Sequence, residues 1–421
     1  MSNFSKSFHS FPLNPIKLLE GSNDLNLEGG YFKLETNKHV LFGKKGKALF
    51  NKNEDFFIPH NYNVFKEIAQ GLNLPTIMNF YDKEIHLIEK RKSELLLNSN
   101  SLPGLFESIE EDTNKIWLDI YNSSEENCLF DAITKYIIQV QAQYFFNYKT
   151  TLKELSQLVY FEDYFTLGIY IYPQTKLKNY FSFGDFVESK NIFNEIYNNI
   201  KSNNSLNGSI KSRFNLEYEF LSEDNIYNQF YNFITAGSAN ISKSLVYLLC
   251  FIKENNYDEV VIKKFNSNNE IYSFAGKLLN EFYRLIPFIE NQVVGPYIYR
   301  RCREDFSISE INHIKKGDEV FYYNTLSNID SSIYENPLIF NPFRENIEHK
   351  GKSSTTYGAG VHRCSGAFLA DLWLHHLLVG YLKSGINLKS EKGLQHLIYN
   401  PDFEEIKKVS YLVKPSKDEE N

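Results

Sequence analysis

The stretch YGAGVHRCSGAFLA, residues 357–370, decides the fold and the chemistry that this sequence predicts. Its three glycines allow tight turns and a close approach of the backbone to a flat ligand. The apolar residues that follow predict a helix from about 365 to 385, with Cys364 at its N-terminus. Backbone N–H groups at such an end favour a thiolate over a thiol. Cys364 is therefore a candidate metal ligand or nucleophile.

Composition narrows the classes of protein to which the chain can belong. With 45 Lys and Arg against 52 Asp and Glu, its net charge is −7, which argues against a broad nucleic-acid surface. The 35 Phe and 29 Tyr are spread along the whole chain, so we attribute them to codon usage rather than to an aromatic-lined pocket.

The four cysteines are scattered, with no close pair and no zinc-type spacing. This pattern predicts a reducing cytoplasm rather than a disulfide scaffold. The N-terminal residues contain no apolar run of the signal-peptide type, and no stretch reaches the roughly 18 apolar residues of a membrane span. We therefore expect a cytoplasmic protein without a membrane anchor.

Hydrophobic periodicity predicts an α-dominated fold with short strands at two places. Residues 30–51 read as strands separated by turns at Asn37–Lys38 and at Gly43–Gly46. Long helices are expected from 224 to about 255, where apolar residues persist over many turns, and from 269 to 286. Residues 292–321 return to short strands and turns.

The 357–370 stretch resembles the heme-ligand loop of the cytochromes P450, F-G-x-G-x-H-x-C-x-G-x-x-L-A. Every specified position matches except the first, where Tyr357 replaces Phe. The resemblance implies that Cys364 is the proximal ligand of heme b (iron protoporphyrin IX), that His362 contacts a propionate, and that Tyr357 and Gly358 belong to the cofactor site. The alternative for a lone cysteine is an inert buried side chain, and the number of matching positions decides against it.

The same resemblance implies a mainly α fold with small β-sheets, the single-domain cytochrome P450 fold. That domain would cover residues 1–421, with 1–29 as an N-terminal extension and 415–421 as a frayed tail.

Glu281 and Arg284 stand three residues apart in a predicted helix and so share one of its faces. Taken alone, the pair indicates a solvated ion pair of little energetic value. The family has an E-x-x-R helix closed by an arginine from a later meander, and the stretch FNPFRE implies Arg344 as that third member. The resemblance gives this network a role in fold and heme retention.

Further basic residues fall where the family binds the two heme propionates. Arg300 occupies one such position, with Arg301 as a close alternative, and His86 and Lys90 match an H-x-x-x-R helix with Lys in place of Arg. An ordinary exposed basic face is the competing interpretation of that helix. Lys90, Arg91 and Lys92 are also predicted parts of a docking patch for an electron donor.

One motif departs from the family. Most members carry A-G-x-D/E-T in the long central helix, where an acid and an alcohol supply protons for oxygen activation. Here Gly237 is retained, but Ala239 stands at the acid position and Asn240 at the alcohol position. Ser238 could substitute after a small shift of the helix. By resemblance, Gly237 and Asn240 flank the oxygen-binding side of the heme.

The resemblance therefore predicts a monooxygenase, an oxidoreductase that oxidises a small hydrophobic or aromatic molecule with O2, in secondary metabolism. The predicted partners are a ferredoxin or flavodoxin, with no nucleic acid and no membrane, and the chain would be a monomer. Non-standard chemistry is the alternative: oxidative phenol coupling, peroxide use or rearrangement. Two rivals are a heme-binding protein without turnover and a heme-free protein with Cys364 as a nucleophile; against the latter, no His and Asp constellation suggests a base.

Overall fold

The computed structural model describes residues 30–52, 54–59, 83–97, 105, 109, 113, 115–119, 127–161, 184–202, 230–234, 237–264, 267–285, 298–309, 312–323, 328, 334–337, 339–344, 357, 363–384, 386 and 410–411. The chain divides into two compact units. Unit 1 comprises Met1–Tyr62, Cys250–Cys364 and Leu394–Phe403, and unit 2 comprises Asn63–Leu249, Ser365–Gly393 and Glu404–Asn421. Each unit is thus assembled from segments that are distant in the sequence.

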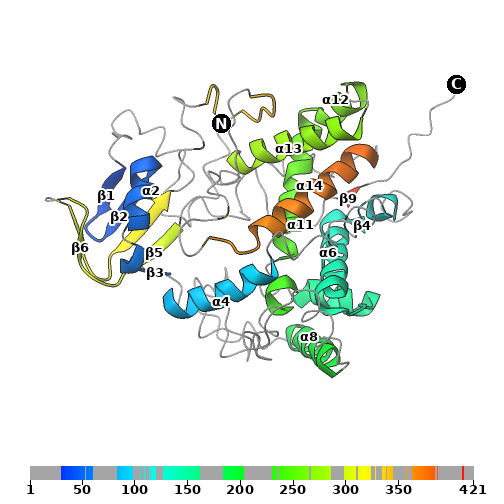
Figure 1. Ribbon diagram of the computed structural model, residues 1–421, viewed down its shortest axis with the longest axis horizontal. Helices are drawn as coiled ribbons and strands as arrows, with labels where there is room; N and C mark the ends of the chain where they lie inside the picture. The colour runs from blue at the N-terminus through cyan, green and yellow to red at the C-terminus, as the bar shows by residue number, and fades with distance from the viewer. Residues whose placement is uncertain are drawn as a thin grey trace. The chain divides into compact units, whose positions relative to one another are not determined.

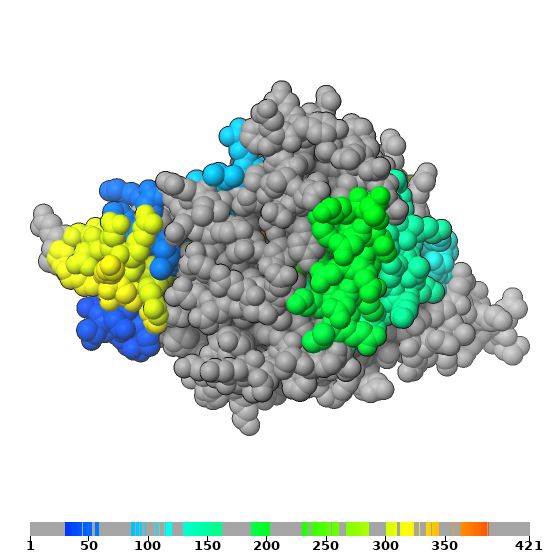
Figure 2. All heavy atoms as spheres, turned by 90° about the horizontal axis from the view of Figure 1, so that it is seen from below, coloured from blue at the N-terminus to red at the C-terminus, as the bar shows by residue number. Residues whose placement is uncertain are grey.

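Unit 1 contains a five-stranded sheet in the order β1-β2-β8-β5-β3 (Figure 1). The pair β2–β8 is parallel and the other neighbouring pairs are antiparallel. Its strands are β1 (Tyr31–Glu35), β2 (Lys38–Phe42), β3 (Phe57–Pro59), β5 (Ile298–Cys302) and β8 (Glu319–Tyr323). The predicted strand regions near residues 30 and 292–321 therefore meet in one sheet, whose blue and yellow segments lie side by side in Figure 2 as well.

The segment after β2 corrects one prediction. Residues 43–50 were expected to form a turn and a strand, whereas the structure has helix α2 (Gly43–Lys52) there. Gly43 adopts a φ of 61°, which turns the chain out of the strand. Phe50 is fully buried and stacks on Tyr322, with ring centroids 4.7 Å apart, so α2 packs its apolar side on the sheet. Burying such a ring contributes about 1.5–3 kcal/mol, and this tertiary contact outweighs the local strand pattern.

The sheet also holds a buried polar cluster. The Tyr31 hydroxyl lies 3.0 Å from Nδ1 of His39, and Nε2 of His39 lies 2.8 Å from a carboxylate oxygen of Asp318. His39 is fully buried, and burial lowers the pKa of its imidazole below the usual 6.5 although Asp318 acts in the opposite sense. The cluster therefore joins β1, β2 and the start of β8 through a neutral imidazole.

The remaining elements of unit 1 are short, apart from one long helix. Helix α13 (Asn268–Leu285) agrees closely with the predicted helix over 269–286. Its buried side includes Phe282, whose ring lies 6.4 Å from that of Phe251. The other elements are α12 (Tyr257–Lys264), the 3-10 turn η4 (Glu54–Phe56), β6 (Phe306–Ser307) and β7 (His313–Ile314).

Among the residues that the structure describes, the strands of unit 2 are the small pair β4 (Asn127–Cys128) and β9 (Ser410–Tyr411), and its other elements are helices. Its core is aromatic: Phe145 stacks on Phe233 with centroids 4.1 Å apart, and Phe161 stacks on Phe193 at 4.9 Å. Its helices are α4 (Lys83–Leu96), α6 (Leu129–Phe146), α8 (Gly184–Ser202), the part of α11 (Ala239–Glu254) up to residue 249, and α14 (Ala367–Ser384).

Helix α14 is the one that the Cys364 stretch enters. It is apolar around most of its circumference, which is typical of a core helix. The indole N–H of Trp117 donates to the carbonyl of Leu377 over 2.9 Å, and the Trp373 ring meets that of Tyr136 on α6 edge-on at 5.7 Å. In the described parts of the chain, no helix has the length and apolar content needed to cross a membrane.

Candidate functional site

Cys364 ends unit 1, and the next residue begins unit 2. It stands three residues before the first residue of α14. Its backbone N–H donates to the carbonyl of Tyr357 over 2.8 Å, which closes the loop between these two residues. Gly358 and His362, the other predicted cofactor contacts in this loop, lie outside the described residues.

The Cys364 side chain is exposed, which sets it apart from Cys250 and Cys302, both buried. Burial raises the pKa of the Cys302 thiol, and its Sγ donates to the carbonyl of Glu304 over 2.7 Å. Because the thiolate is the form that binds metals, a buried thiol with a raised pKa is a poor ligand. Among the three cysteines whose side chains the structure describes, Cys364 is the one that an external ligand can reach.

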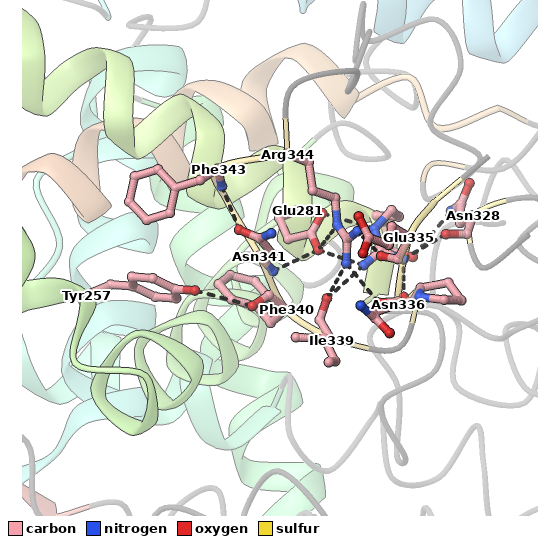
Figure 3. A network of polar contacts seen from close by, with 12 residues as sticks. Tyr257, Glu281, Asn328, Glu335, Asn336, Ile339, Phe340, Asn341, Phe343 and Arg344 are labelled. Atoms are coloured by element: carbon pink, nitrogen blue, oxygen red, sulfur yellow. Dashed lines mark hydrogen bonds and ion pairs between the residues drawn. The ribbon is translucent and has the colours of Figure 1, made fainter. Parts of the chain in front are cut away.

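Glu281 is the centre of a buried polar network near the end of α13 (Figure 3). Its two carboxylate oxygens accept a bidentate pair of bonds from Arg284, at 3.0 Å from Nε and 2.6 Å from Nη2. The same carboxylate accepts from Nε of Arg344 at 3.1 Å and from the backbone N–H of Asn341 at 2.9 Å. Both Glu281 and Arg284 side chains have 0% exposure, so the solvated ion pair that the spacing alone suggested is wrong.

The two arginines extend this network to the meander, residues 334–344. Arg284 donates to the carbonyls of Asn328, Pro337 and Ile339, and its guanidinium lies 5.0 Å from the ring of Tyr334. Arg344 donates to the carbonyls of Glu335, Asn336 and Ile339. Planar guanidinium forks suit such multiple bonds better than an ammonium would. The network thus fixes the meander backbone to α13 within unit 1.

The predicted propionate ligands lie in both units. In unit 2, His86 and Lys90 of α4 are buried, at 1% and 8% exposure, so the alternative of an ordinary exposed basic face is wrong for them. Because Lys90 is buried, it does not present its charge as the predicted docking patch requires, whereas Arg91 is exposed. In unit 1, Arg300 of β5 is half-buried and its neighbour Arg301 is exposed, as strand alternation requires.

The segment that leads into α11 is not one continuous α-helix. Residues 230–234 are helical, 237–238 form a turn, and α11 begins at Ala239. The N–H of Gly237 bonds to the carbonyl of Asn232 over 3.0 Å, five residues back instead of four. A Cβ on Gly237 would lie 2.9 Å from the carbonyl oxygen of Phe233, so the close backbone approach requires glycine.

Two serine hydroxyls next to this turn are already engaged. Ser238 is fully buried and its hydroxyl donates to the carbonyl of Ile234. The hydroxyl of Ser242 donates to the carbonyl of Ser238 over 3.1 Å. Since each hydroxyl has one proton to donate, neither is a ready substitute for the family's alcohol. Asn240 is exposed, and Ala239 offers no acidic group.

Comparisons with known proteins show a similarity to one family. The sequence model of the family "Cytochrome P450" matches residues 274–384, which include α13, Glu281, Arg284, Arg344 and Cys364. "Cytochrome P450 708A2" from Arabidopsis thaliana is 30% identical over 116 residues, 26% of this chain and 23% of that protein. The "Abietadienol/abietadienal oxidase" from Pinus taeda is 30% identical over 104 residues, 24% of this chain and 20% of that protein.

The fold comparison extends over nearly the whole chain. The crystal structure of a Bacillus megaterium cytochrome P450 in complex with corticosterone aligns with a TM-score of 0.62 at 13% identity, covering 93% of this chain and 95% of that one. The chain is similar to the cytochromes P450 in sequence over residues 274–384 and in fold over nearly its whole length. The predicted mainly α fold with small sheets is confirmed. The matched sequence spans less than a quarter of the length of either curated relative, so the family likeness in sequence rests on the region around α13 and Cys364.

The residues present fit the heme that this family carries. An exposed Cys364 thiol before a helix N-terminus supplies a sulfur ligand. The groups predicted for the propionates are of the kind that pair with carboxylates: His86 and Lys90 are buried in unit 2, where Lys90 lies 3.6 Å from Glu94, and Arg300 is half-buried in unit 1.

Some features of this site escaped sequence reasoning. The hydroxyl of Tyr357 donates to that of Tyr283 over 3.1 Å, although nothing in the spacing of these two residues announces a contact. The hydrogen bond from the backbone N–H of Asn341 to the Glu281 carboxylate also could not be predicted from the sequence.

Proposed function

We propose that this protein is a heme-thiolate oxidoreductase, a monooxygenase that oxidises a small hydrophobic or aromatic molecule with O2 and electrons from a redox partner. The observation that carries the proposal is the exposed Cys364, tied through its backbone to Tyr357 just before α14, in a chain with the cytochrome P450 fold. When bound, a thiolate-ligated heme supplies the activation of dioxygen.

The chain's own residues have three tasks in this function. Cys364 must be held as an anion in one position, because a displacement of the sulfur changes the ligand geometry. His86, Lys90 and Arg300, with His362, would neutralise two propionates. Burying an ionised carboxylate without a partner costs far more than the roughly 2–7 kcal/mol of an uncompensated neutral polar group. Glu281, Arg284 and Arg344 keep the meander fixed, which is a structural task.

The proton supply is the step for which the chain departs from most relatives. Ala239 cannot carry a proton, and the hydroxyls of Ser238 and Ser242 donate to backbone carbonyls. A second candidate function follows: heme-thiolate chemistry that needs no acid and alcohol pair, such as peroxide use, oxidative phenol coupling or rearrangement. The absence of the acid and alcohol pair is also compatible with a protein that binds heme but does not turn over a substrate.

Partners and substrate follow from the proposed reaction. The electrons would come from a ferredoxin or flavodoxin, and Arg91 is exposed at the predicted docking position. A hydrophobic substrate is supported by the name of the Pinus taeda relative, an abietadienol/abietadienal oxidase. The three cysteines whose side chains the structure describes form no disulfide, which supports a cytoplasmic location. A monomer acting in secondary metabolism completes the proposal.

The decisive experiment is the absorption spectrum of the reduced, CO-bound protein, recorded for the wild type, Cys364→Ala and Cys302→Ala. Thiolate ligation shifts the main band far to the red of histidine-ligated heme. The proposal expects the red-shifted band in the wild type and in the Cys302→Ala control, and its loss in Cys364→Ala. A band that persists in Cys364→Ala, or that never forms in the wild type, would refute the proposal.

A second experiment separates the two candidate reactions. Oxidation of a hydrophobic test substrate is measured with NAD(P)H and a surrogate redox pair, and again with hydrogen peroxide alone. Monooxygenase chemistry predicts turnover with the redox pair, and an increase in product per electron for Asn240→Thr. Turnover with peroxide alone, unaffected by Asn240→Thr, would favour the second candidate.

A further inference from the structure

Tyr357 occupies the position at which the family's heme loop has Phe, and it adds a hydroxyl that Phe lacks. The structure gives that hydroxyl a partner, because it donates to the hydroxyl of Tyr283 over 3.1 Å. The two rings also meet at a steep angle, with centroids 5.6 Å apart. The carbonyl of Tyr357 accepts the N–H of Cys364 over 2.8 Å. One residue thus contacts both α13 and the backbone of the predicted ligand.

Tyr283 lies in α13, which a buried polar network anchors within unit 1. Glu281 and Arg284 lie one turn apart on one side of α13 and are buried in the network with Arg344. Tyr283 is two residues after Glu281, so it projects from a different side of the same turn. It is 9% exposed, which leaves its ring little room to move. The last turn of α13 therefore fixes the meander on one side and reaches Tyr357 from another.

We infer that the Tyr283–Tyr357 pair is a tether that positions Cys364 as the heme ligand; the inference rests on the proposed function of that cysteine. Without the tether the 357–364 loop would still be closed by the Cys364 N–H bond, but its first residue would lose its hydroxyl bond to a buried helix. Both tyrosines act through the backbone of Tyr357, so they are positioning residues. The consequence is a better-defined place for the Cys364 sulfur.

The test uses the full chain with Tyr283→Phe, Tyr357→Phe and the double variant. Each change keeps the ring and removes the hydroxyl, so the packing of unit 1 is retained. Tyr148→Phe is the matched control, because its hydroxyl also bonds to a side chain, a carboxylate oxygen of Glu154 at 2.7 Å, but within unit 2. The first measurement is the rate at which the heme-supplied, reduced, CO-bound protein loses its thiolate band. A general loss of stability would raise this rate in the control as well.

The second measurement needs no heme. The rate at which a disulfide reagent modifies Cys364 is followed in the heme-free full chain, with the same variants in a Cys364→Ser background to subtract other thiols. One hydrogen bond corresponds to a change of about three- to tenfold in either rate. The tether predicts that increase for each single variant, no further increase for the double variant, and none for Tyr148→Phe.

Single variants with wild-type rates in both measurements would overturn the inference, and so would single effects that add in the double variant, because a shared bond can be lost once. Failure of the proposed function looks different. In that case the wild type shows no thiolate band, while the thiol-modification rates still decide whether Tyr283 restrains the Cys364 loop.

Discussion

The last turn of α13 and the first turn of α11 both carry family motifs, and they differ in how completely the chain retains them. In α13, Glu281 and Arg284 are present, buried and joined by Arg344. The glycine remains at 237, just before α11, but at the start of α11 Ala239 and Asn240 replace the acid and the alcohol. The chain therefore retains every residue of the motif around Glu281. Of the motif around α11 it retains the glycine but neither the acid nor the alcohol.

The physical demands on the two turns explain the contrast. A buried carboxylate facing two guanidinium groups cannot be altered singly, because each remaining charge would be left in the core without a partner. The turn before α11 needs glycine for a close backbone approach to Phe233, whereas Ala239 carries no charge and the Asn240 side chain is exposed. Under the proposed function, heme retention and oxygen chemistry would therefore be separable properties of this chain.

The largest effect should come from breaking the complete motif. Glu281→Gln leaves Arg284 and Arg344 without their counter-charge, and we expect it to lower the free energy of unfolding by about 3–5 kcal/mol. Urea unfolding followed by circular dichroism measures this change. Asp305→Asn, which removes the exposed partner of Lys315, is the control and should leave the midpoint almost unchanged. Equal urea midpoints for the two variants would show that the buried Glu281 network contributes no more to stability than an exposed ion pair.

The second effect concerns the backbone of the other turn. Gly237→Ala places a methyl group 2.9 Å from the carbonyl oxygen of Phe233, so one of the two backbones must shift. We expect a loss of about 1–3 kcal/mol in the free energy of unfolding, the usual cost of overpacking. The same urea titration measures it. Wild-type stability in this variant would mean that the turn has no need of glycine.

A smaller effect tests the serine hydroxyls. Ser242→Ala removes the buried hydrogen bond from the Ser242 hydroxyl to the carbonyl of Ser238. That carbonyl still accepts the backbone N–H of residue 242 over 3.0 Å. We expect a loss of about 0.5–1.5 kcal/mol in unfolding free energy and no change in product formed per electron. A fall in that ratio without loss of stability would show that the Ser242 hydroxyl takes part in proton delivery.

The smallest effect concerns His39, the other buried polar centre of unit 1. Burial lowers the pKa of its imidazole below 6.5, so the unfolded chain takes up a proton at a higher pH than the folded chain. The free energy of unfolding is therefore not reduced by His39 above pH 6.5, and it decreases as the pH falls from 6.5 toward the lower pKa of the folded state. Asp318, Tyr31 and Lys33 are the titratable groups facing it. Urea midpoints at about pH 7.5 and 5.5 should differ less in His39→Gln than in the wild type, and equal differences would contradict this assignment.

The sequence predicted α13, α14 and the β-rich character of residues 292–321, because long apolar periodicity and turn residues determine these elements locally. It failed at residues 43–50, where burial of Phe50 against Tyr322 decides for a helix, and at 237–238, where a turn stands in place of the expected long helix. It also predicted the Glu281, Arg284 and Arg344 set, but only through the family resemblance. The hydrogen bond between Tyr283 and Tyr357 could not be predicted from the sequence. The two residues are 74 positions apart, and only the tertiary structure shows that their hydroxyls meet.

The most direct test of the account is X-ray absorption at the iron edge of the heme-supplied protein, wild type beside Cys364→Ala. We predict one sulfur scatterer among the nearest neighbours of the iron in the wild type, and its replacement by a nitrogen or oxygen neighbour, or loss of the iron, in the variant. A wild-type spectrum with nitrogen and oxygen neighbours alone would contradict the assignment of Cys364 as the heme ligand.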